Sequence, residues 1–457
     1  MKPINERRIV YDILFEVKKK NKSCAVTIDN IFISKKCSEL TSVSKKFITN
    51  VAYGTIENII LIDYYLSKLL TRPINKVNPS ILIILELSAY QILCADNIPE
   101  SAAVNEAVKL TEELGMVKLK GFVNGVLRNL IRKKDEIQLP SEDNYKDFLS
   151  VKYSIQKDIL DIWENALKNS DDSEVESLDE LARNTRDSKK IYIRINTEKS
   201  SEPYLAALLE DEGVDVDIAP KYYDDSEKGM EMQNDLESKC LSISNFDSLR
   251  NLESFKDGLF YVQDLSSILS YENVRIEDGA QILDMCASPG GKSIGAYLNV
   301  SEYGNCTITA RDKTKAKAAT VKENIKRLGI QDITAEVKDA CEYYEDDFEK
   351  YDVVIADVPC SGLGVISKKP DINMHFKKSG IKELLEIQKK IIDNAVKYLK
   401  SGGKLIYSTC TFNTEENEDN VEYILKNNDM KLDFSKQYLP TEEIHMDGFF
   451  IAIFTKE

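Results

Sequence analysis

The sequence predicts a multidomain chain: an all-α N-terminal domain, a small α+β middle module and a C-terminal doubly wound α/β domain. Three observations predict this order. Apolar residues recur at helical spacing through residues 5–135, an alternating strand pattern appears at 190–196, and short apolar runs alternate with helical patterns from Gly279 onward. A length of 457 residues also suits about three domains. We expect the three parts at residues 1–140, 141–260 and 261–457.

The composition, with 42% apolar and 30% charged residues, is typical of a soluble globular protein. Its net charge of −16 is unevenly distributed. Residues 1–140 hold 21 Lys and Arg against 15 Asp and Glu, whereas residues 141–260 hold 15 against 29. The basic N-terminal part could therefore contact the phosphates of a nucleic acid. The acidic run at 171–176 (DDSEVE) is expected to form a solvated linker or loop.

The nine cysteines and two histidines bear on compartment and metal binding. No two cysteines form a CxxC pair and their number is odd, so no metal site is expected. Reduced thiols in a cytoplasmic enzyme fit this pattern best. The polar start of the chain predicts no signal peptide. The most apolar stretch, at 81–95, is too short and too interrupted by polar residues to span a membrane.

The helical patterns of the N-terminal part carry a resemblance to a known family. Segments 90–93 (YQIL), 98–99 (IP), 103–108 (AVNEAV) and 122–128 (FVNGVLR) are similar, in this order, to the NusB family of helical RNA-binding domains. Most of these residues also suit a helical core. The resemblance implies RNA binding, for which the basic side chains are the better candidates: Arg128, Arg132, Lys133 and Lys134.

The middle module is expected to contain a strand at 190–196, a helix at 202–209 and a strand at 214–218. Arg194 and Asn196 lie in the first strand, where they either contact RNA or belong to an exposed strand face.

From Gly279 onward the pattern alternates between strands and helices, which is typical of a doubly wound α/β domain. The expected strands are 281–285, 306–310, 332–337, 352–356 and 404–409, and the expected helices are 292–299, 313–328 and 382–400.

A glycine-containing loop, 286–292 (CASPGGK), separates the first of these strands from the first helix. Glycines let the backbone approach a ligand, and a helix N-terminus favours an anionic group. A phosphate-binding P-loop is one interpretation, since the loop ends in Gly-Lys-Ser and Asp357 closes an apolar run. However, Cys286 stands where a P-loop requires glycine, and Pro289 is unexpected among amides that cradle phosphates.

A nucleoside cofactor explains this loop better. Asp312 follows the second strand, about 20 residues after the glycines, where a carboxylate holds ribose hydroxyls in Rossmann-type sites. Asp339 follows the third strand and could accept a hydrogen bond from an adenine amino group. The predicted cofactor-binding residues are Cys286, Ala287, Ser288, Pro289, Gly290, Gly291, Lys292, Asp312, Asp339 and Asp357.

Two further loops each carry a cysteine after a short buried strand. Asp357 and Cys360 follow the strand at 352–356, and Cys410 follows the strand at 404–409. Side chains at the carboxyl ends of such strands face the ligand crevice, so two thiols and a carboxylate could converge there. A thiol can attack an electron-poor ring carbon, and a carboxylate can activate the ring by hydrogen bonding. The alternative is two buried cysteines in one core.

These motifs resemble the NOL1/NOP2/Sun family of S-adenosylmethionine-dependent RNA 5-methylcytosine methyltransferases. The similar segments are 261–267 (YVQDLSS), 283–292 (LDMCASPGGK), 357–362 (DVPCSG), 370–372 (PDI), 408–410 (STC), 415–417 (EEN) and 447–450 (DGFF). Thr411 stands where serine is usual, and Lys369 replaces a common histidine. With the NusB-like domain in front, the resemblance implies a bacterial enzyme acting on 16S ribosomal RNA, the family target being cytosine 967.

The resemblance also implies roles for single residues. Cys410 is the nucleophile that adds to cytosine C6, Asp357 hydrogen-bonds the cytosine edge, and Cys360 helps to resolve the adduct. Lys292 either holds the target or Asp357, or faces solvent as an ordinary helix lysine. The cytosine must be single-stranded or flipped out of a helix. The alternative function is a non-catalytic, NusB-like RNA-binding or antitermination factor.

Overall fold

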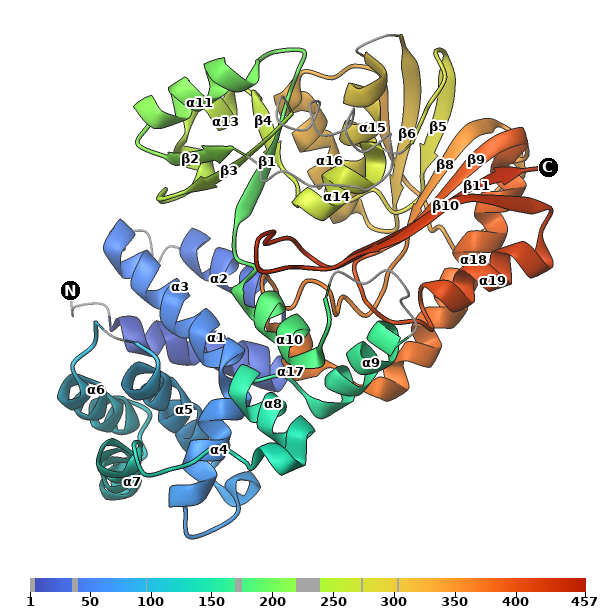
Figure 1. Ribbon diagram of the computed structural model, residues 1–457. Coiled ribbons are helices and arrows are strands. Elements are labelled where there is room, and N and C mark those ends of the chain that lie inside the picture. The colour runs from blue at the N-terminus through green and yellow to red at the C-terminus, as the bar shows by residue number, and fades with distance from the viewer. Residues whose placement is uncertain are drawn as a thin grey trace. The chain divides into compact units, whose positions relative to one another are not determined.

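The computed structural model describes residues 5–34, 40–95, 97–168, 175–218, 239–272, 274–301 and 304–457. The chain forms two compact units (Figure 1). The helical unit contains Met1–Asp161 and Ile366–Phe376, and the sheet unit contains Ile162–Val365 and Lys377–Glu457. Across the described ranges, none of the helices is both long enough and apolar enough to cross a membrane.

The helical unit confirms the all-α fold predicted for the N-terminal part. Its main helices are α1 (Glu6–Lys20), α2 (Cys24–Ile33), α3 (Ser42–Glu57), α4 (Ile59–Leu69), α5 (Pro79–Leu93), α6 (Glu100–Glu113), α7 (Lys120–Lys133) and α8 (Tyr145–Tyr153). Most side chains of α5 are buried, because this helix is apolar on nearly every face and packs against α1, α3, α4, α6 and α7. Its start is fixed by Asn78, whose side chain accepts hydrogen bonds from the amides of Ser80 and Ile81.

A buried acidic pair lies in this helical core. Glu86 of α5 is fully buried and bonds Lys18 of α1, with 2.5 Å between Oε1 and Nζ. Asp63 of α4 lies beside it. Burial, and then the charge of Glu86, raise the pKa of Asp63 well above its ordinary value, so Asp63 keeps its proton in the folded protein.

A short segment distant in sequence completes the helical unit. The helix α17 (Asp371–His375) contacts α3, and its Met374 packs against the apolar core of the unit. Asn373 accepts a hydrogen bond from the amide of Gln156 at 2.9 Å and donates to the carbonyl of Ser154 at 2.7 Å. Residues 366–376 therefore belong to the helical unit, although they follow the Cys360 loop in the chain.

The chain passes from the helical unit to the sheet unit within helix α9 (Lys157–Lys168), between Asp161 and Ile162. Helix α10 (Leu178–Asp187) follows in the sheet unit. A four-stranded antiparallel sheet follows, in the order β2-β3-β1-β4. Its elements are β1 (Ile191–Ile195), α11 (Glu202–Asp211), β2 (Asp215–Ile218), β3 (Cys240–Ser244), α13 (Glu253–Lys256) and β4 (Phe260–Val262). The two strands and the helix predicted here are confirmed. Most of the acidic run, residues 171–174, lies outside the described residues.

The prediction that Arg194 and Asn196 contact RNA or lie on an exposed face is wrong. Arg194 is 1% exposed and donates a hydrogen bond to Asn299, and Asn196 is fully buried. The side-chain amide of Asn196 donates to the carbonyls of Gly258 and Leu328, at 2.9 and 3.0 Å. Both side chains link the small sheet to the following α/β domain. The strand pattern could not predict their burial, because it does not show that neighbouring helices cover this face of the sheet.

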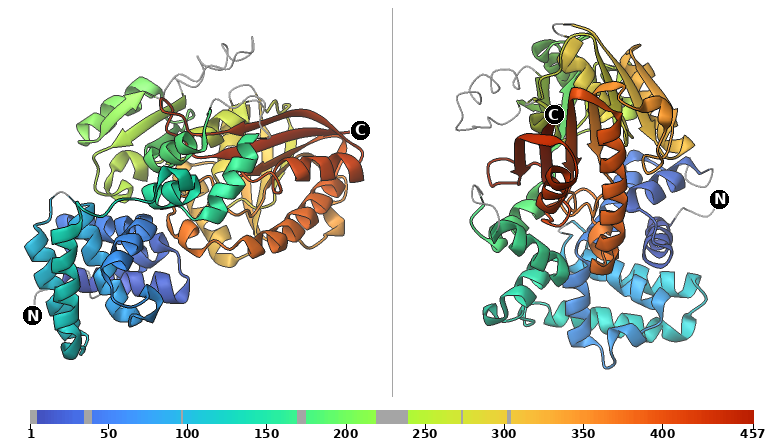
Figure 2. Two further views of the ribbon diagram at one scale, coloured as in Figure 1. Left: turned by 60° about the horizontal axis from the view of Figure 1, so that its bottom comes forward. Right: turned by 90° about the vertical axis from the view of Figure 1, so that its right-hand side faces the viewer.

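The α/β domain is built on a seven-stranded sheet with the order β10-β11-β9-β8-β5-β6-β7. Its strands are β5 (Ala280–Asp284), β6 (Cys306–Asp312), β7 (Ile333–Val337), β8 (Tyr351–Asp357), β9 (Leu399–Thr409), β10 (Met430–Tyr438) and β11 (Phe449–Lys456). The five strands from β5 to β9 are parallel and match the five predicted strands. The last two were not predicted. Strand β11 runs antiparallel to β9, and β10 runs antiparallel to β11. Both appear as the red strands at one edge of the sheet in Figure 2.

Helices cover both faces of this sheet, as a doubly wound fold requires. They are α14 (Leu265–Glu272), α15 (Gly291–Ser301), α16 (Lys315–Leu328), α18 (Ile381–Tyr398) and α19 (Glu418–Asn427). Successive strand residues point to opposite faces, so Ile282 packs with residues of α14, α15 and α16, while Leu283 packs with residues of α18 and α19. Strand β5 pairs with β6 on one side and β8 on the other, which creates the switch point where such sheets bind ligands.

The buried acidic pair predicts a pH dependence of stability. In the unfolded chain Asp63 loses its proton near pH 4, whereas in the folded chain it keeps it to a higher pH. The free energy of unfolding should therefore fall as pH rises above about 4, by up to ~1.4 kcal/mol per pH unit. Asp63→Asn should flatten this slope and raise stability at neutral pH, as measured by urea unfolding between pH 4 and 8.

The matched control is Asp29→Asn, on the exposed face of α2. This substitution should leave the slope of the free energy of unfolding against pH the same as in the natural protein. An equal slope for Asp63→Asn and the natural chain would contradict the prediction that Asp63 is protonated in the folded state.

Candidate active site

Pairing between β8 and β9 brings the two cysteine loops together. These strands are parallel, and their register places Asp357, the last residue of β8, opposite Ser408 of β9. Each strand then enters its loop at the same edge of the sheet. As a result the Sγ atoms of Cys360 and Cys410 lie 3.3 Å apart, close enough to share a hydrogen bond.

Asp357 is held between two donors at this edge. Lys292, in the first turn of α15, forms a salt bridge with it, at 2.9 Å between Nζ and Oδ2. The hydroxyl of Ser408 donates to its other oxygen, Oδ1, at 2.8 Å. Burial opposes the charged form of Lys292, but Asp357 outweighs burial and raises the pKa of the lysine. Lys292 is therefore a partner of Asp357 with a side chain only 23% exposed, and not a solvent-facing lysine.

The two thiols are electrostatically linked. The hydrogen bond to Cys410, followed by burial and the charge of Cys410, raises the pKa of Cys360 well above its ordinary value. Cys360 therefore keeps its proton in the resting site, and either sulfur can be the donor of the hydrogen bond between them. Two sulfur atoms at this distance suit one nucleophile and one proton carrier.

The glycine loop does not have the hydrogen bonding of a P-loop. Four of its amides already donate to protein oxygens: Cys286 to Asp284 Oδ1 at 3.3 Å, Ala287 to Arg311 O at 2.8 Å, Ser288 to Asp312 Oδ2 at 3.3 Å, and Gly290 to Ala287 O at 2.6 Å. Amides that cradle phosphates must point at the ligand instead. This arrangement disfavours the nucleoside triphosphatase interpretation.

The two acids predicted to bind a nucleoside lie after neighbouring strands. Asp312 ends β6 and is 4% exposed, with Lys317 Nζ at 3.4 Å. Asp339 follows β7 and pairs with Lys313 at 2.8 Å. Hydrogen bonding to that lysine lowers the pKa of Asp339, so its carboxylate is charged and can accept at neutral pH. Because β6 and β7 are paired and parallel, both acids lie at the same edge of the sheet as the thiols.

Two acidic residues of the site were not singled out from the sequence. Asp284 ends β5, is fully buried and accepts a hydrogen bond from Ser293 Oγ at 2.6 Å. Burial raises its pKa to about 7. Its position at a strand end, like that of Asp312 and Asp357, was the available signal. Glu416 is also fully buried and lies in the loop after β9. Its available signal was the segment 415–417 (EEN), which is part of the family resemblance.

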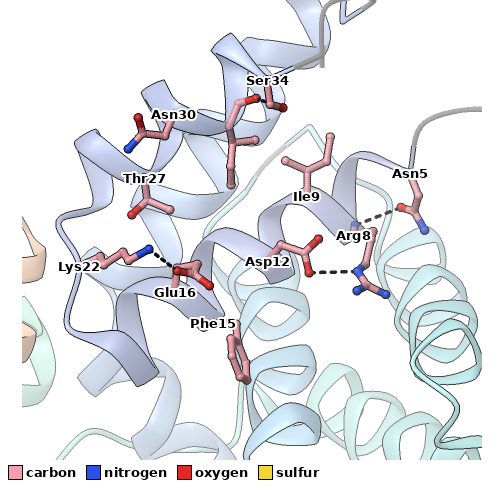
Figure 3. Close-up of a pocket in the computed structure, with 11 residues that line it drawn as sticks. Asn5, Arg8, Ile9, Asp12, Phe15, Glu16, Lys22, Thr27, Asn30 and Ser34 are labelled. Carbon is pink, nitrogen blue, oxygen red and sulfur yellow. Dashed lines mark hydrogen bonds and ion pairs between the residues drawn. The ribbon is translucent and has the colours of Figure 1, made fainter. Parts of the chain in front are cut away.

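A separate hollow in the helical unit does not share this chemistry. It lies between α1 and α2 and has a volume of about 680 Å³. Figure 3 shows its charged side chains paired within the wall, Arg8 with Asp12 and Lys22 with Glu16. With its charges neutralised in pairs and no thiol among its lining residues, it offers neither a nucleophile nor a net field for phosphate.

Comparison with known proteins supports two domains. Residues 273–455 match the family model of the 16S rRNA methyltransferase RsmB/F, and residues 4–132 match that of the NusB family. The chain is 29% identical to the probable ribosomal RNA small subunit methyltransferase B of Bacillus subtilis, over the full length of both chains. It is 28% identical to ribosomal RNA small subunit methyltransferase B of Proteus mirabilis, over 92% of each.

Solved structures are similar in fold. The crystal structure of PH0851 is 21% identical, with a TM-score of 0.78 over 99% of each chain. NSun6 from Pyrococcus horikoshii, solved with SFG, is 24% identical, with a TM-score of 0.51 over 66% of this chain and 98% of that one. Residues 273–455 therefore form a domain of the 16S rRNA methyltransferase RsmB/F family, and residues 4–132 form a domain of the NusB family.

Proposed function

We propose that this protein transfers a methyl group from S-adenosylmethionine to C5 of a cytosine in 16S rRNA, by way of a covalent bond between Cys410 and C6. The observation that carries the proposal is the pair of thiols 3.3 Å apart, beside the Asp357–Lys292 salt bridge. Together, the two thiols and Asp357 place a nucleophile, a proton carrier and a carboxylate that can bind the cytosine at one edge of the sheet. The family target, cytosine 967, is the position we propose.

The residues of the glycine loop fit S-adenosylmethionine. Gly290 has a φ of +110°, a backbone conformation that residues with a side chain rarely adopt, so glycine suits this turn of the loop. Asp312 would hold the ribose hydroxyls and Asp339 the adenine amino group, with the remaining contacts from the loop 286–292. When bound, the cofactor supplies an electrophilic methyl group.

Cys410 and Asp357 would prepare the cytosine. C5 of cytosine is a poor nucleophile, but a bond from the Cys410 thiolate to C6 makes C5 enamine-like and able to take a methyl group. Asp357, oriented by Lys292 and Ser408, would accept a hydrogen bond from the exocyclic amino group of the base. Uracil presents an acceptor at that position, so the same carboxylate would select cytosine.

Cys360 would then release the product. After methyl transfer C5 carries both the methyl group and its original hydrogen. Cys360 takes this hydrogen as a proton, the C–H electron pair restores the C5–C6 double bond, and Cys410 leaves as a thiolate. Cys360 must first release its own thiol proton to solvent water. Bond formation by Cys410 removes the hydrogen bond and the charge that raise the pKa of Cys360 beyond the effect of burial, so the thiolate is easier to form at this stage.

The helical unit would hold the RNA so that a single-stranded or flipped cytosine reaches the site. Arg128, Arg132 and Lys133 are exposed on α7 and free to approach phosphates. Lys134 pairs with Glu100 at 2.8 Å, which makes it a weaker candidate than the sequence predicts.

The two thiols should respond differently to substitution. Cys410→Ala should lose methylation and form no covalent RNA adduct. Cys360→Ala should still attack and transfer, then stall as an adduct that survives a denaturing gel, with turnover reduced by about 100-fold or more. The measurement is to incubate each variant with target RNA and S-adenosylmethionine and look for the slowly migrating band.

A band with Cys410→Ala and none with Cys360→Ala would show that the roles are reversed. No band with either variant, while the natural protein methylates, would contradict the proposed role of Cys360. RNA binding by the natural protein without methylation would favour the non-catalytic alternative.

The cofactor proposal predicts S-adenosylmethionine binding at one molecule per chain. Asp312→Ala should weaken binding by about 10- to 100-fold, because it removes charge-assisted hydrogen bonds to the ribose. Isothermal calorimetry measures this, with Asp332→Ala as the control, since Asp332 is exposed in the loop before β7. Heat from ATP and none from S-adenosylmethionine would favour a triphosphate site instead.

The RNA proposal predicts a change in salt dependence. Arg128→Ala with Arg132→Ala should weaken RNA binding and reduce the slope of log K against log salt by about 1.5. The control is Lys109→Ala on α6, which is also exposed but paired with Glu106. Point substitutions are preferable to deletion of residues 1–140, because deletion would remove the packing partners of Met374. An unchanged slope would place the RNA surface elsewhere.

A further inference from the structure

Glu416 has an unusual environment for a fully buried carboxylate. Its four hydrogen-bond donors are all neutral: Ser361 N at 2.9 Å and Gln388 Nε2 at 3.0 Å to Oε1, and Ser361 Oγ at 2.5 Å and Asn413 Nδ2 at 2.9 Å to Oε2. A buried carboxylate costs free energy that hydrogen bonds only partly offset, so it is a weak device for stability alone. Its value therefore lies in the geometry that it imposes.

Three of the four donors come from the two loops that carry the thiols, and the fourth, Gln388, comes from α18. Ser361 directly follows Cys360, and Asn413 lies three residues after Cys410. The carboxylate of Glu416 thus ties one loop to the other. A backbone bond from Gly364 N to the carbonyl of Cys410, at 3.0 Å, is a second tie between the same loops.

Helices behind the loops hold the bridge in place. Gln388 of α18 donates to the carbonyl of Pro359 at 3.0 Å as well as to Glu416. Its own side-chain oxygen accepts from Asn420 of α19 at 2.8 Å, which fixes the orientation of the amide. Asn420 also bonds the carbonyl of Glu416, at 3.0 Å. The hydrogen bonds of Glu416 to the two loops are therefore also anchored to helices α18 and α19.

We propose that Glu416 is a positioning residue that sets the distance between the sulfur atoms of Cys360 and Cys410. The proposal deepens the proposed function, because a nucleophile and a proton carrier must meet the same cytosine ring. It predicts that the two thiols separate when the carboxylate is replaced, while each remains reactive. A displacement of about 1 Å in such a site can lower a rate by about 100-fold.

Glu416→Gln tests this with almost no change of shape. Four hydrogen-bond donors surround the side chain of residue 416, and a glutamine there adds a fifth donor, its own NH₂ group, among them. The Ser361 amide cannot invert, and Gln388 is held by Asn420, so those two donors require the glutamine oxygen. The new NH₂ group then faces Asn413 Nδ2, a donor against a donor within the Cys410 loop. The Ser361 hydroxyl must turn to accept from the NH₂ group, so its charge-assisted bond across the loops is replaced by a weaker neutral one.

The experiment compares two readouts. Phenylarsine oxide reports the distance between the thiols directly: its arsenic forms a bond to each sulfur, and its oxygen leaves as water with the two thiol protons. Capture by both thiols should be at least 10-fold weaker in Glu416→Gln than in the natural protein, with Cys360→Ala giving the one-thiol baseline. Methylation should show a kcat at least 10-fold lower, with KM for RNA and S-adenosylmethionine unchanged.

The matched control is Glu415→Gln, the same change one residue earlier on an exposed side chain. It should behave as the natural protein in both readouts. If Glu416→Gln does not fold, Ser361→Ala removes one donor and should show smaller losses in the same direction.

Full arsenical capture by Glu416→Gln, or by Ser361→Ala where the first variant does not fold, would overturn the proposal, whatever happens to methylation. Weaker capture in a protein that proves not to methylate cytosine would leave the positioning role standing and refute the proposed function instead. The positioning role of Glu416 and the proposed methylation of cytosine can therefore be refuted independently.

Discussion

The parallel pairing of β8 with β9 is the constraint on which the site depends. Its register sets Asp357 opposite Ser408, and so fixes where each cysteine loop leaves the sheet. Neither loop could bring its thiol within 3.3 Å of the other without that alignment. The pairing of β5 with β8 extends the same logic, since it places the glycine loop and Lys292 beside Asp357.

Buried acids recur through this chain, and the fold accommodates them in three ways. Asp347 is matched by Arg311 in a two-pronged ion pair, with distances of 2.7 and 2.9 Å. Asp284 has its pKa raised by burial, to about 7, so protonation lessens the cost of its charge. Glu416 is surrounded by neutral donors. The first solution suits stability, whereas the other two occur at the sheet edge that carries the glycine loop and the two thiols.

The helical and sheet units are interleaved along the chain. After the Cys360 loop, residues 366–376 leave the sheet unit, join the helical unit through Asn373 and Met374, and return to α18. The helical unit is therefore more than an appended module, because it supplies the packing for a segment that lies between two parts of the catalytic sheet.

The sequence by itself determined the elements whose signals are local. Apolar periodicity located the N-terminal helices and the five parallel strands, and the loop residues identified both cysteines and Asp357. Strand β11 was missed because periodicity alone cannot distinguish a continuous apolar run from a buried helix. Strand β10 was missed although its residues 430–435 alternate between apolar and polar side chains. Tertiary structure alone decided that Arg194 is buried, that Glu416 bridges two loops and that the thiols meet. Such contacts depend on strand register and on what covers each face, which join residues far apart in the chain and leave no local pattern.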